Sequence, residues 1–429
     1  MTTAAAGHDR GQDGNGTPHP MQRLIDSLAG AGGRRASAWE SAGREWDSAE
    51  QFNQILAVLR ADHADAAKNT KKRLRTVSKT FGLRKVECGL LFLAAATDLD
   101  ANVGLAFAQL RGLTGVARPT ISLALELVAV PTAGAASFAL LGPSGELRRS
   151  RLLDVSDAEP WLGRLLSVPP SVAAVLAGGR PCDPVVARLR TAVVPLVLPG
   201  TATVARAIGQ GVGLTWVRSP AGSSGASLAA GAFAELSRTC LSIDVRRHLP
   251  SLGMADVLTA AAREAGLVNS GLLVIGAEAL AEPLDYAAFE AMDRAAVPVV
   301  AVGSRPWNPA WLARLPLLID AEPLLVSDRA AIWRDSLGEF ADQDELRESL
   351  PGLRLTADEV SEAARYARLL ATTGDGVLSI AAIREAARRI GGSGLGGNSA
   401  PPGSGPTFDD LVLPPHTAAE LRRLVSWAQ

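Results

Sequence analysis

The residues best suited to chemistry lie in one glycine- and serine-rich stretch, AGSSGAS, at positions 221–227. An apolar, partly β-branched segment precedes it, and a run of small residues with an Ala/Leu/Phe face follows. This pattern predicts a strand, a loop, a helix and a second strand between Gly213 and Asp244. The loop supplies Gly222 and Gly225 for backbone angles that other residues avoid. A loop that leads from a strand to a helix N-terminus is where the pattern G-x-x-x-x-G-K-[ST] holds phosphate groups.

The stretch keeps only part of that phosphate-binding pattern. The second glycine is present as Gly225 and the final hydroxyl as Ser227. Pro220 stands in place of the first glycine, and Ala226 stands in place of the lysine that would reach the phosphates. The sequence therefore predicts a loop with the shape of a phosphate cradle but without its cation.

Hydrolysis of a nucleotide in such a site also needs an acidic pair after the third strand. One acid holds Mg²⁺, and the neighbouring glutamate polarises the attacking water. Here the apolar segment LLVI is followed by Gly276 and Ala277, and Glu278 lies one position further on. The site thus lacks both the lysine and the acidic pair. These two independent losses favour an α/β domain whose residues serve packing and not catalysis. We therefore expect no catalytic residue, no metal site, and at most weak binding of ATP and Mg²⁺.

An active enzyme is the second class of function that the sequence leaves open. It would be a weak ATPase, or a dinucleotide enzyme in which Asp244 holds a ribose about 20 residues past the loop. The loop glycines do not fit the pattern G-x-G-x-x-G that such an enzyme needs. Nucleotide binding would identify this class.

The overall composition predicts a multidomain protein without a strong charge bias. The chain has 429 residues, 47% of them hydrophobic, and a net charge of −1, which gives no general attraction to nucleic acid or to an anionic membrane. Three widely spaced cysteines fit a reducing compartment, and we expect a cytoplasmic protein. The most membrane-like run, residues 121–142, is interrupted by Glu126 and Pro131, and we interpret it as a buried helix followed by a strand.

The N-terminal third combines a tail with a helical domain. Residues 1–48 are rich in small and polar residues and predict a flexible tail. Residues 49–180 predict a long helical segment, three short helices, and a hairpin formed by SFALLG and ELRRSRLLDV around residues 143–145. Three helices followed by a hairpin is the order of a winged helix.

The third of these short helices is poorly suited to reading DNA. A reading helix presents polar side chains to base edges. Here only Arg118, Thr120 and Ser122 precede an apolar run. The sequence favours a helix that packs on protein, and a DNA-binding regulator remains a third class, which salt-dependent duplex binding would identify.

A basic run without an intervening acid lies before these helices. It consists of Lys68, Lys71, Lys72, Arg73, Arg75, Lys79, Arg84 and Lys85. We predict a solvated helix face, with a patch for anions or nucleic acid as the alternative.

The rest of the chain predicts an α/β domain and a helical end. After a connector at 181–211, strands and helices alternate over residues 212–335, which indicates a parallel sheet covered by helices on both faces. A helical lid is expected at 336–390, with Thr356 and Glu359 as its capping box. Residues 391–406 predict a flexible linker. Residues 407–429 predict a strand-like segment and an amphipathic helix, too short to form a domain.

The order of these segments resembles bacterial two-module AAA ATPases that carry an N-terminal winged-helix region and are often encoded with contractile injection systems. The resemblance covers most of residues 80–429. Its strongest stretches are FGLRKVECGLLFLAAATDLD, ARPTISLALELV, VPVVAVGSRPW, SDRAAIWRDSLG and FDDLVLPPHTAAELRRLV. None is a short catalytic motif, so the resemblance rests on their order.

The resemblance implies a multidomain α plus α/β fold, in which a winged-helix-like domain precedes a degenerate P-loop AAA module with a helical lid. Gly225 and Ser227 match the family's phosphate loop, Ser304 lies near its sensor position, and Arg329 lies in the helix after the sheet. Ala226, Gly276 and Ala277 depart from the family's pattern.

The resemblance also implies partners. Residues 407–429 would lead into an active AAA module, in the same polypeptide or in a separate chain, with a homo-oligomeric ring as a further option. The residues and the resemblance together predict a non-catalytic, ATPase-derived scaffold. It would act in assembling or remodelling a protein complex such as a contractile injection system, without a specific nucleic acid or a membrane.

Overall fold

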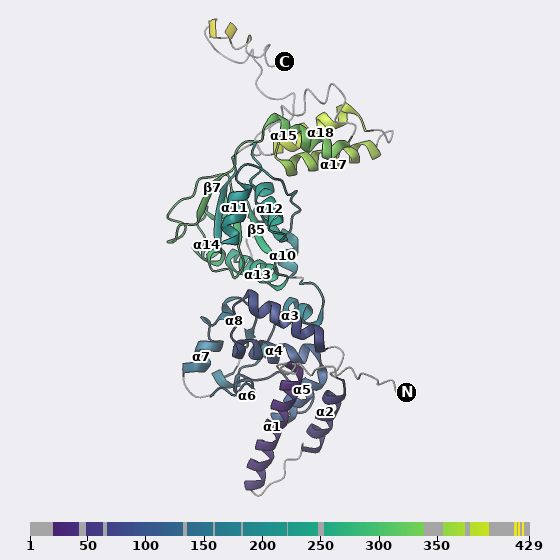
Figure 1. The fold of residues 1–429 in the computed structure, drawn as a ribbon, viewed down its shortest axis with the longest axis vertical. Coiled ribbons are helices and arrows are strands. Elements are labelled where there is room, and N and C mark those ends of the chain that lie inside the picture. The colour runs from purple at the N-terminus through teal and green to yellow at the C-terminus, as the bar shows by residue number, and fades with distance from the viewer. Residues whose placement is uncertain are drawn as a thin grey trace, which may run out of the picture. The chain divides into compact units, whose positions relative to one another are not determined.

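In the computed structural model the chain divides into two units, residues 1–323 and 324–429 (Figure 1). The described residues are 20–42, 49–62, 67–131, 135–157, 159–181, 183–220, 222–247, 253–338, 355–373, 378–393, 416, 417, 419, 420 and 423.

The first unit begins with a helical region built around one apolar core. The core includes Leu28, Phe52, Leu91, Phe107 and Ile121. Its helices are α1 (Pro20–Ser41), α2 (Ala49–Asp62), α3 (Ala67–Thr80), α4 (Lys85–Leu99), α5 (Ala101–Leu110), α6 (Ile121–Leu127), α7 (Ala135–Leu141), α8 (Glu146–Arg149) and α9 (Pro170–Ala177). Two short strands, β1 (Asp154–Val155) and β2 (Leu166–Ser167), pair antiparallel within it.

Helix α1 corrects the predicted flexible tail at 1–48. Residues 20–41 are helical, and Leu24, Ile25 and Leu28 are almost fully buried in the core. Their spacing is that of one helix face, but the surrounding glycines and alanines hid this signal. Residues 1–19 and 43–48 lie outside the described residues.

The predicted hairpin is wrong in its first strand. Residues 137–141, SFALL, belong to helix α7, and ELRR forms the short helix α8. The observed antiparallel pair instead joins Val155 to Leu166 and Asp154 to Ser167. A short apolar run does not distinguish a strand from a buried helix by periodicity, and here burial of Leu140 and Leu141 stabilises the helix.

The N-terminus of α4 is held by a buried carboxylate. Glu87, whose side chain is 5% exposed, accepts the backbone N–H of Arg84 at 2.8 Å and pairs with its guanidinium at 2.8 Å. The hydrogen bond from the Arg84 side chain lowers the pKa of Glu87. The charged carboxylate is therefore the form that stabilises the folded chain.

We expect this pair to make the helical region sensitive to acid. Because the folded-state pKa of Glu87 is lowered, its contribution is present above the unfolded-state pKa of about 4.3 and is lost as the pH falls through the folded-state value. In Glu87→Gln the free energy of unfolding should therefore fall less steeply than in the wild type as the pH decreases. Urea unfolding followed by circular dichroism from pH 3 to 7 measures this, and parallel curves for both proteins would contradict it.

The second part of the first unit is an α/β domain with a five-stranded sheet. Its strands run in the order β4-β5-β6-β3-β7, and every neighbouring pair is parallel. The strands are β3 (Leu214–Arg218), β4 (Cys240–Asp244), β5 (Gly271–Ile275), β6 (Val299–Gly303) and β7 (Leu317–Asp320). The helices are α10 (Pro184–Leu189), α11 (Thr201–Gly209), α12 (Gly225–Glu235), α13 (Met254–Leu267) and α14 (Tyr286–Asp293). The predicted parallel sheet is confirmed.

Both faces of the sheet are covered, as predicted. Val217, Leu273 and Val300 pack against α11 and α12 on one face. Trp216 and Val274 face α10, α13, α14 and the segment after β6 on the other. Because α10 and α11 contribute to these two cores, residues 184–209 belong to the α/β domain and are not the connector predicted at 181–211.

The second unit is helical where it is described. It contains α15 (Val326–Leu337), α17 (Ala357–Thr373) and α18 (Ile380–Ser393). The capping box at α17 is confirmed, since Thr356 N–H donates to Glu359 Oε2 at 2.7 Å and Glu359 N–H donates to Thr356 Oγ1 at 3.3 Å. Helix α15 belongs to this unit, although we predicted residues 326–335 in the α/β domain.

Two C-terminal predictions fall largely outside the described residues. Residues 391–393 complete α18, whereas the rest of the predicted linker and most of the predicted lead-in at 407–429 are not described. Within the described part of the chain, no single helix is long and apolar enough to cross a membrane. The pair α4 and α5 reaches the required length and hydropathy only together and is bent by 112°.

Candidate functional site

Five of the six predicted site residues lie at the carboxyl ends of the parallel strands: Gly222, Gly225 and Ser227 follow β3, Glu278 follows β5, and Ser304 follows β6. From β3 the chain passes into α12, on the face that holds Val217. From neighbouring β6 it passes to the opposite face, where Trp311 packs. Adjacent strands whose connections go to opposite faces form a switch point, which is where open α/β sheets bind ligands. The residues predicted from the phosphate-binding pattern thus lie at the edge of the sheet where proteins of this architecture bind ligands.

The loop after β3 uses its own hydroxyl groups to satisfy its backbone. Ser219 Oγ accepts the N–H of Gly225 at 3.0 Å and lies 2.9 Å from Ser223 Oγ. Ser223 Oγ also donates to the Pro220 carbonyl at 2.7 Å. Gly225 is the first residue of α12, so its N–H is a group that a phosphate cradle would direct at the anion. Here an internal hydroxyl takes that position.

The same loop has little room to open around Gly225. A Cβ on Gly225 would lie 2.7 Å from Ser219 Cβ and 3.1 Å from Val217 Cγ1. Gly222 adopts the left-handed φ of +82° that the sequence anticipated. Ser223 is fully buried and pairs with Pro323 in an isolated antiparallel bridge. The loop is folded onto itself and partly covered by the segment after β7.

Ser227 matches the final hydroxyl of the phosphate-binding pattern. Its side chain is fully buried, and its Oγ has no hydrogen-bond partner. In a P-loop this hydroxyl binds Mg²⁺. Its neighbour Ala226 carries no positive charge, and the Ser219 hydroxyl already accepts the N–H of Gly225 at the start of α12. The residues present therefore do not fit ATP with Mg²⁺.

An arginine covers the position where the first acid of an ATPase would stand. A Cβ on Gly276, whose φ is +72°, would lie 2.5 Å from Arg246 Cγ and 2.6 Å from Arg246 Nε. Arg246 donates Nε and Nη2 to the two oxygens of Asp244, each at 2.9 Å. The guanidinium therefore places a positive charge beside the position where the pattern has its first acid. It also engages Asp244, which argues against the ribose role considered for that residue.

Glu278 and Ser304 are brought together, although they are 26 residues apart. Ser304 N–H donates to Glu278 Oε2 at 3.3 Å. Elsewhere at this edge, Arg218 pairs with Asp320 at 2.8 Å, and Arg305 pairs with Glu282. Arg218 and Arg305 at this edge are thus each paired with a carboxylate of this chain.

Arg329 does not join this cluster in the first unit. It lies in α15 of the second unit, is 9% exposed, and donates to the carbonyl of Leu324.

The sequence alone did not identify Ser219, Ser223 and Arg246 as residues that shape the site. Their only local signals are serines on both sides of Pro220 and an arginine two residues after Asp244.

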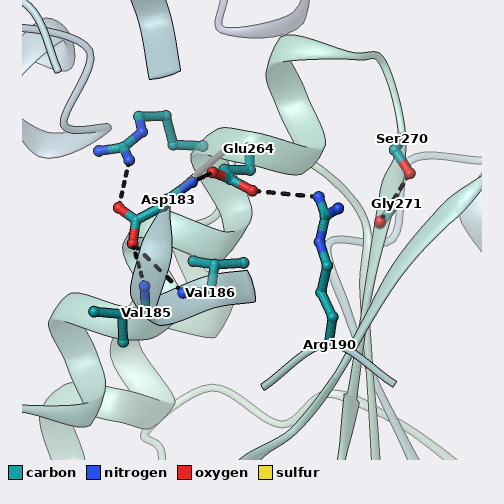
Figure 2. A network of polar contacts seen from close by, with 8 residues as sticks. Asp183, Val185, Val186, Arg190, Glu264, Ser270 and Gly271 are labelled. Carbon is teal, nitrogen blue, oxygen red and sulfur yellow. Dashed lines mark hydrogen bonds and ion pairs between the residues drawn. The ribbon is translucent and has the colours of Figure 1, made fainter. Parts of the chain in front are cut away.

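A polar network around the buried Glu264 and Arg263 side chains holds α13 in place. Asp183 caps α10 by accepting two backbone N–H groups, and its own N–H donates to Glu264 (Figure 2). Arg263 donates to Asp183 at 3.0 Å, and Arg190 donates to Glu264 at 3.4 Å. Burial raises the pKa of Glu264, while the Asp183 N–H and the Arg190 charge act in the opposite direction. Each charge has a partner, so the network serves to position elements.

The third short helix, α6, uses its polar residues internally. Arg118 pairs with Asp98 at 2.7 Å. Thr120 is the N-cap of α6 and accepts the N–H of Leu123 at 3.2 Å. Five of the seven helix residues are buried, which leaves little surface to enter a DNA groove. The buried residues of α6 pack within this chain, and its polar neighbours Arg118 and Thr120 are engaged there as well.

Comparison with known proteins supports the winged-helix prediction in its coarse form. Residues 6–182 match a family described as "Winged helix domain, variant". No curated protein matches the chain. A solved structure of C. elegans PCH-2 is similar at 14% identity, over 46% of this chain and 68% of that one, with a TM-score of 0.30. So low a TM-score supports no conclusion about the fold or function of this chain.

Proposed function

We propose that this chain is a non-catalytic, ATPase-derived scaffold. In this proposal its winged-helix region binds protein, and its α/β domain retains the frame of a nucleotide site without the chemistry. The observation that carries the proposal is the hydrogen bond from Gly225 N–H to Ser219 Oγ at 3.0 Å. The N–H group that a phosphate would need at the helix N-terminus is therefore already engaged. Arg246 over Gly276 adds a second, independent obstacle.

The proposal extends to partners through the resemblance stated above. The scaffold would work with an active AAA module, in the same polypeptide or in another chain, and residues 407–429 would lead into it. A ring of several copies would fit such an assembly. The role proposed is to assemble or remodel a protein complex, and a contractile injection system is the example that the resemblance offers.

A weakly nucleotide-binding protein is the second candidate function. The isolated hydroxyl of Ser227 favours it, because a buried hydroxyl without a partner is costly and a bound ligand would satisfy it. The closed loop and Ala226 act against it, so this candidate ranks below the scaffold.

We expect no measurable ATP hydrolysis by the purified chain in the presence of Mg²⁺. A charge-assisted hydrogen bond contributes roughly 1.5–3 kcal/mol, so loss of the lysine alone should weaken phosphate binding about 10- to 100-fold. Ala226→Lys should not restore turnover, because Ser219 still occupies the helix N-terminus. Phosphate release from the wild-type chain, Ala226→Lys and Ser227→Ala measures this. Wild-type turnover that disappears in Ser227→Ala would contradict the proposal.

A further inference from the structure

The helical region contains an open groove that is separate from the candidate nucleotide site of the α/β domain. It has a volume of about 710 Å³ and lies between α1, α3, α4 and the end of α6. Its floor is apolar and includes Leu24, Leu74, Phe92 and Leu127. These residues are largely buried, whereas Val86 and Val128 are half-exposed along the groove. An apolar trough between helices is suited to receive apolar side chains.

The charged residues that line the groove all carry the same sign. They are Arg23 on α1, Lys71 and Arg75 on α3, and Lys85 at the start of α4. No carboxylate is among the described residues that line it. Three residues of the basic run at 68–85 therefore border an apolar surface instead of forming a uniformly solvated helix face.

The nearby acids are engaged with other residues. Glu87 on α4 pairs with Arg84 at 2.8 Å, and Glu126 on α6 pairs with Arg34 at 2.8 Å. Asp26 on α1 accepts a hydrogen bond from Gln22. The groove thus combines an apolar floor with a positive rim, and its complement is a surface that is apolar in the middle and acidic at the sides.

We propose that this groove docks an acidic amphipathic helix of a protein partner. Such a helix would lay leucine-like side chains at i, i+3, i+4 and i+7 on the floor and direct its carboxylates at Arg23, Arg75 and Lys85. This deepens the proposed scaffold function by naming the class of partner that its winged-helix region binds.

Two other ligand classes fit the groove less well. A fatty acid carries one negative charge, whereas the cations here come from three different helices around the rim. Single-stranded nucleic acid needs several aromatic faces for stacking, but Phe92 is the one aromatic side chain among the described residues that line the groove. Cys88 also lines the groove, and burial raises the pKa of its thiol, so it lies there as a small apolar side chain.

The test uses the full chain and three fluorescein-labelled synthetic probes. The first probe is a 16-residue peptide with leucines on one helix face and glutamates beside them. The second has the same composition in scrambled order, and the third has its leucines replaced by alanine. Fluorescence anisotropy at low and at physiological salt should show binding of the first probe only, weakened by salt.

A charge-reversal pair locates the binding to the groove. Arg75→Glu/Lys85→Glu changes two exposed rim residues and should weaken binding of the first probe about tenfold or more, because like charges then face each other. Lys72→Glu/Lys79→Glu has the same net charge, changes exposed residues of α3 that do not line the groove, and should bind as the wild type does. Circular dichroism confirms that both variants are folded.

Three outcomes would overturn the docking proposal. The first is no binding of the acidic peptide, and the second is equal loss in both double variants. The third is binding of a fluorescent fatty acid or of duplex DNA that depends on Arg75 and Lys85 while the peptide does not bind. None of these results bears on nucleotide turnover, so failure of the groove and failure of the degenerate nucleotide site are distinguished by separate assays.

Discussion

Replacement of Glu264 by alanine should lower the free energy of unfolding of the first unit by about 1–3 kcal/mol, because it removes the acceptor of a buried backbone N–H group. The Glu264 side chain is 1% exposed and accepts from Asp183 N–H and from Arg190. Its loss leaves the Asp183 N–H without an acceptor inside the protein. It also removes a charge that partly balances Arg263, whose side chain is 5% exposed.

The same helix supplies a matched control. Asp256 is also an acid on α13 that pairs with an arginine, Arg151, but its side chain is 63% exposed. Exposed pairs contribute at most about 1 kcal/mol, so Asp256→Ala should lower stability by no more than that. Urea unfolding followed by circular dichroism measures both variants. Equal losses in the two variants would show that burial of the network does not matter.

Replacement of Trp216 by alanine should cost about 3–5 kcal/mol, as large aromatic deletions in cores do. Trp216 on β3 is 1% exposed, and its ring centroid lies 5.4 Å from that of Trp307 and 5.2 Å from that of Trp311. Its indole N–H donates to the Arg305 carbonyl at 3.2 Å. One side chain thus connects the sheet to the segment that follows β6.

A graded series tests whether packing or the hydrogen bond dominates at Trp216. Trp216→Phe keeps an aromatic ring and loses the indole N–H, so we expect a smaller loss than for Trp216→Ala. The ring also lies against Gly303, so Trp216→Ala should speed hydrogen exchange at Ser304, next to the contact with Glu278. A change below about 1 kcal/mol for Trp216→Ala would contradict this account of the core.

Much of the α/β domain could be predicted from the residues alone. Apolar segments such as Leu272–Val274 are short and continuous, and amphipathic helices separate them, which is the pattern of a parallel sheet covered on both faces. The capping box of Thr356 and Glu359 is equally local, because both bonds span three residues. The secondary structure of the helical region was harder to predict, since SFALLG fits a strand and a buried helix equally well.

The state of the candidate site depended on contacts between residues distant in sequence. The residue types revealed that the lysine and the acidic pair are missing, but not what fills their places. Arg246 covers Gly276 because β4 and β5 are neighbours in the sheet, and Pro323 covers Ser223 because β7 lies beside β3. The groove likewise requires α1 to lie near α3 and α4. Local periodicity determines elements and their order, whereas strand order and helix packing determine which side chains meet.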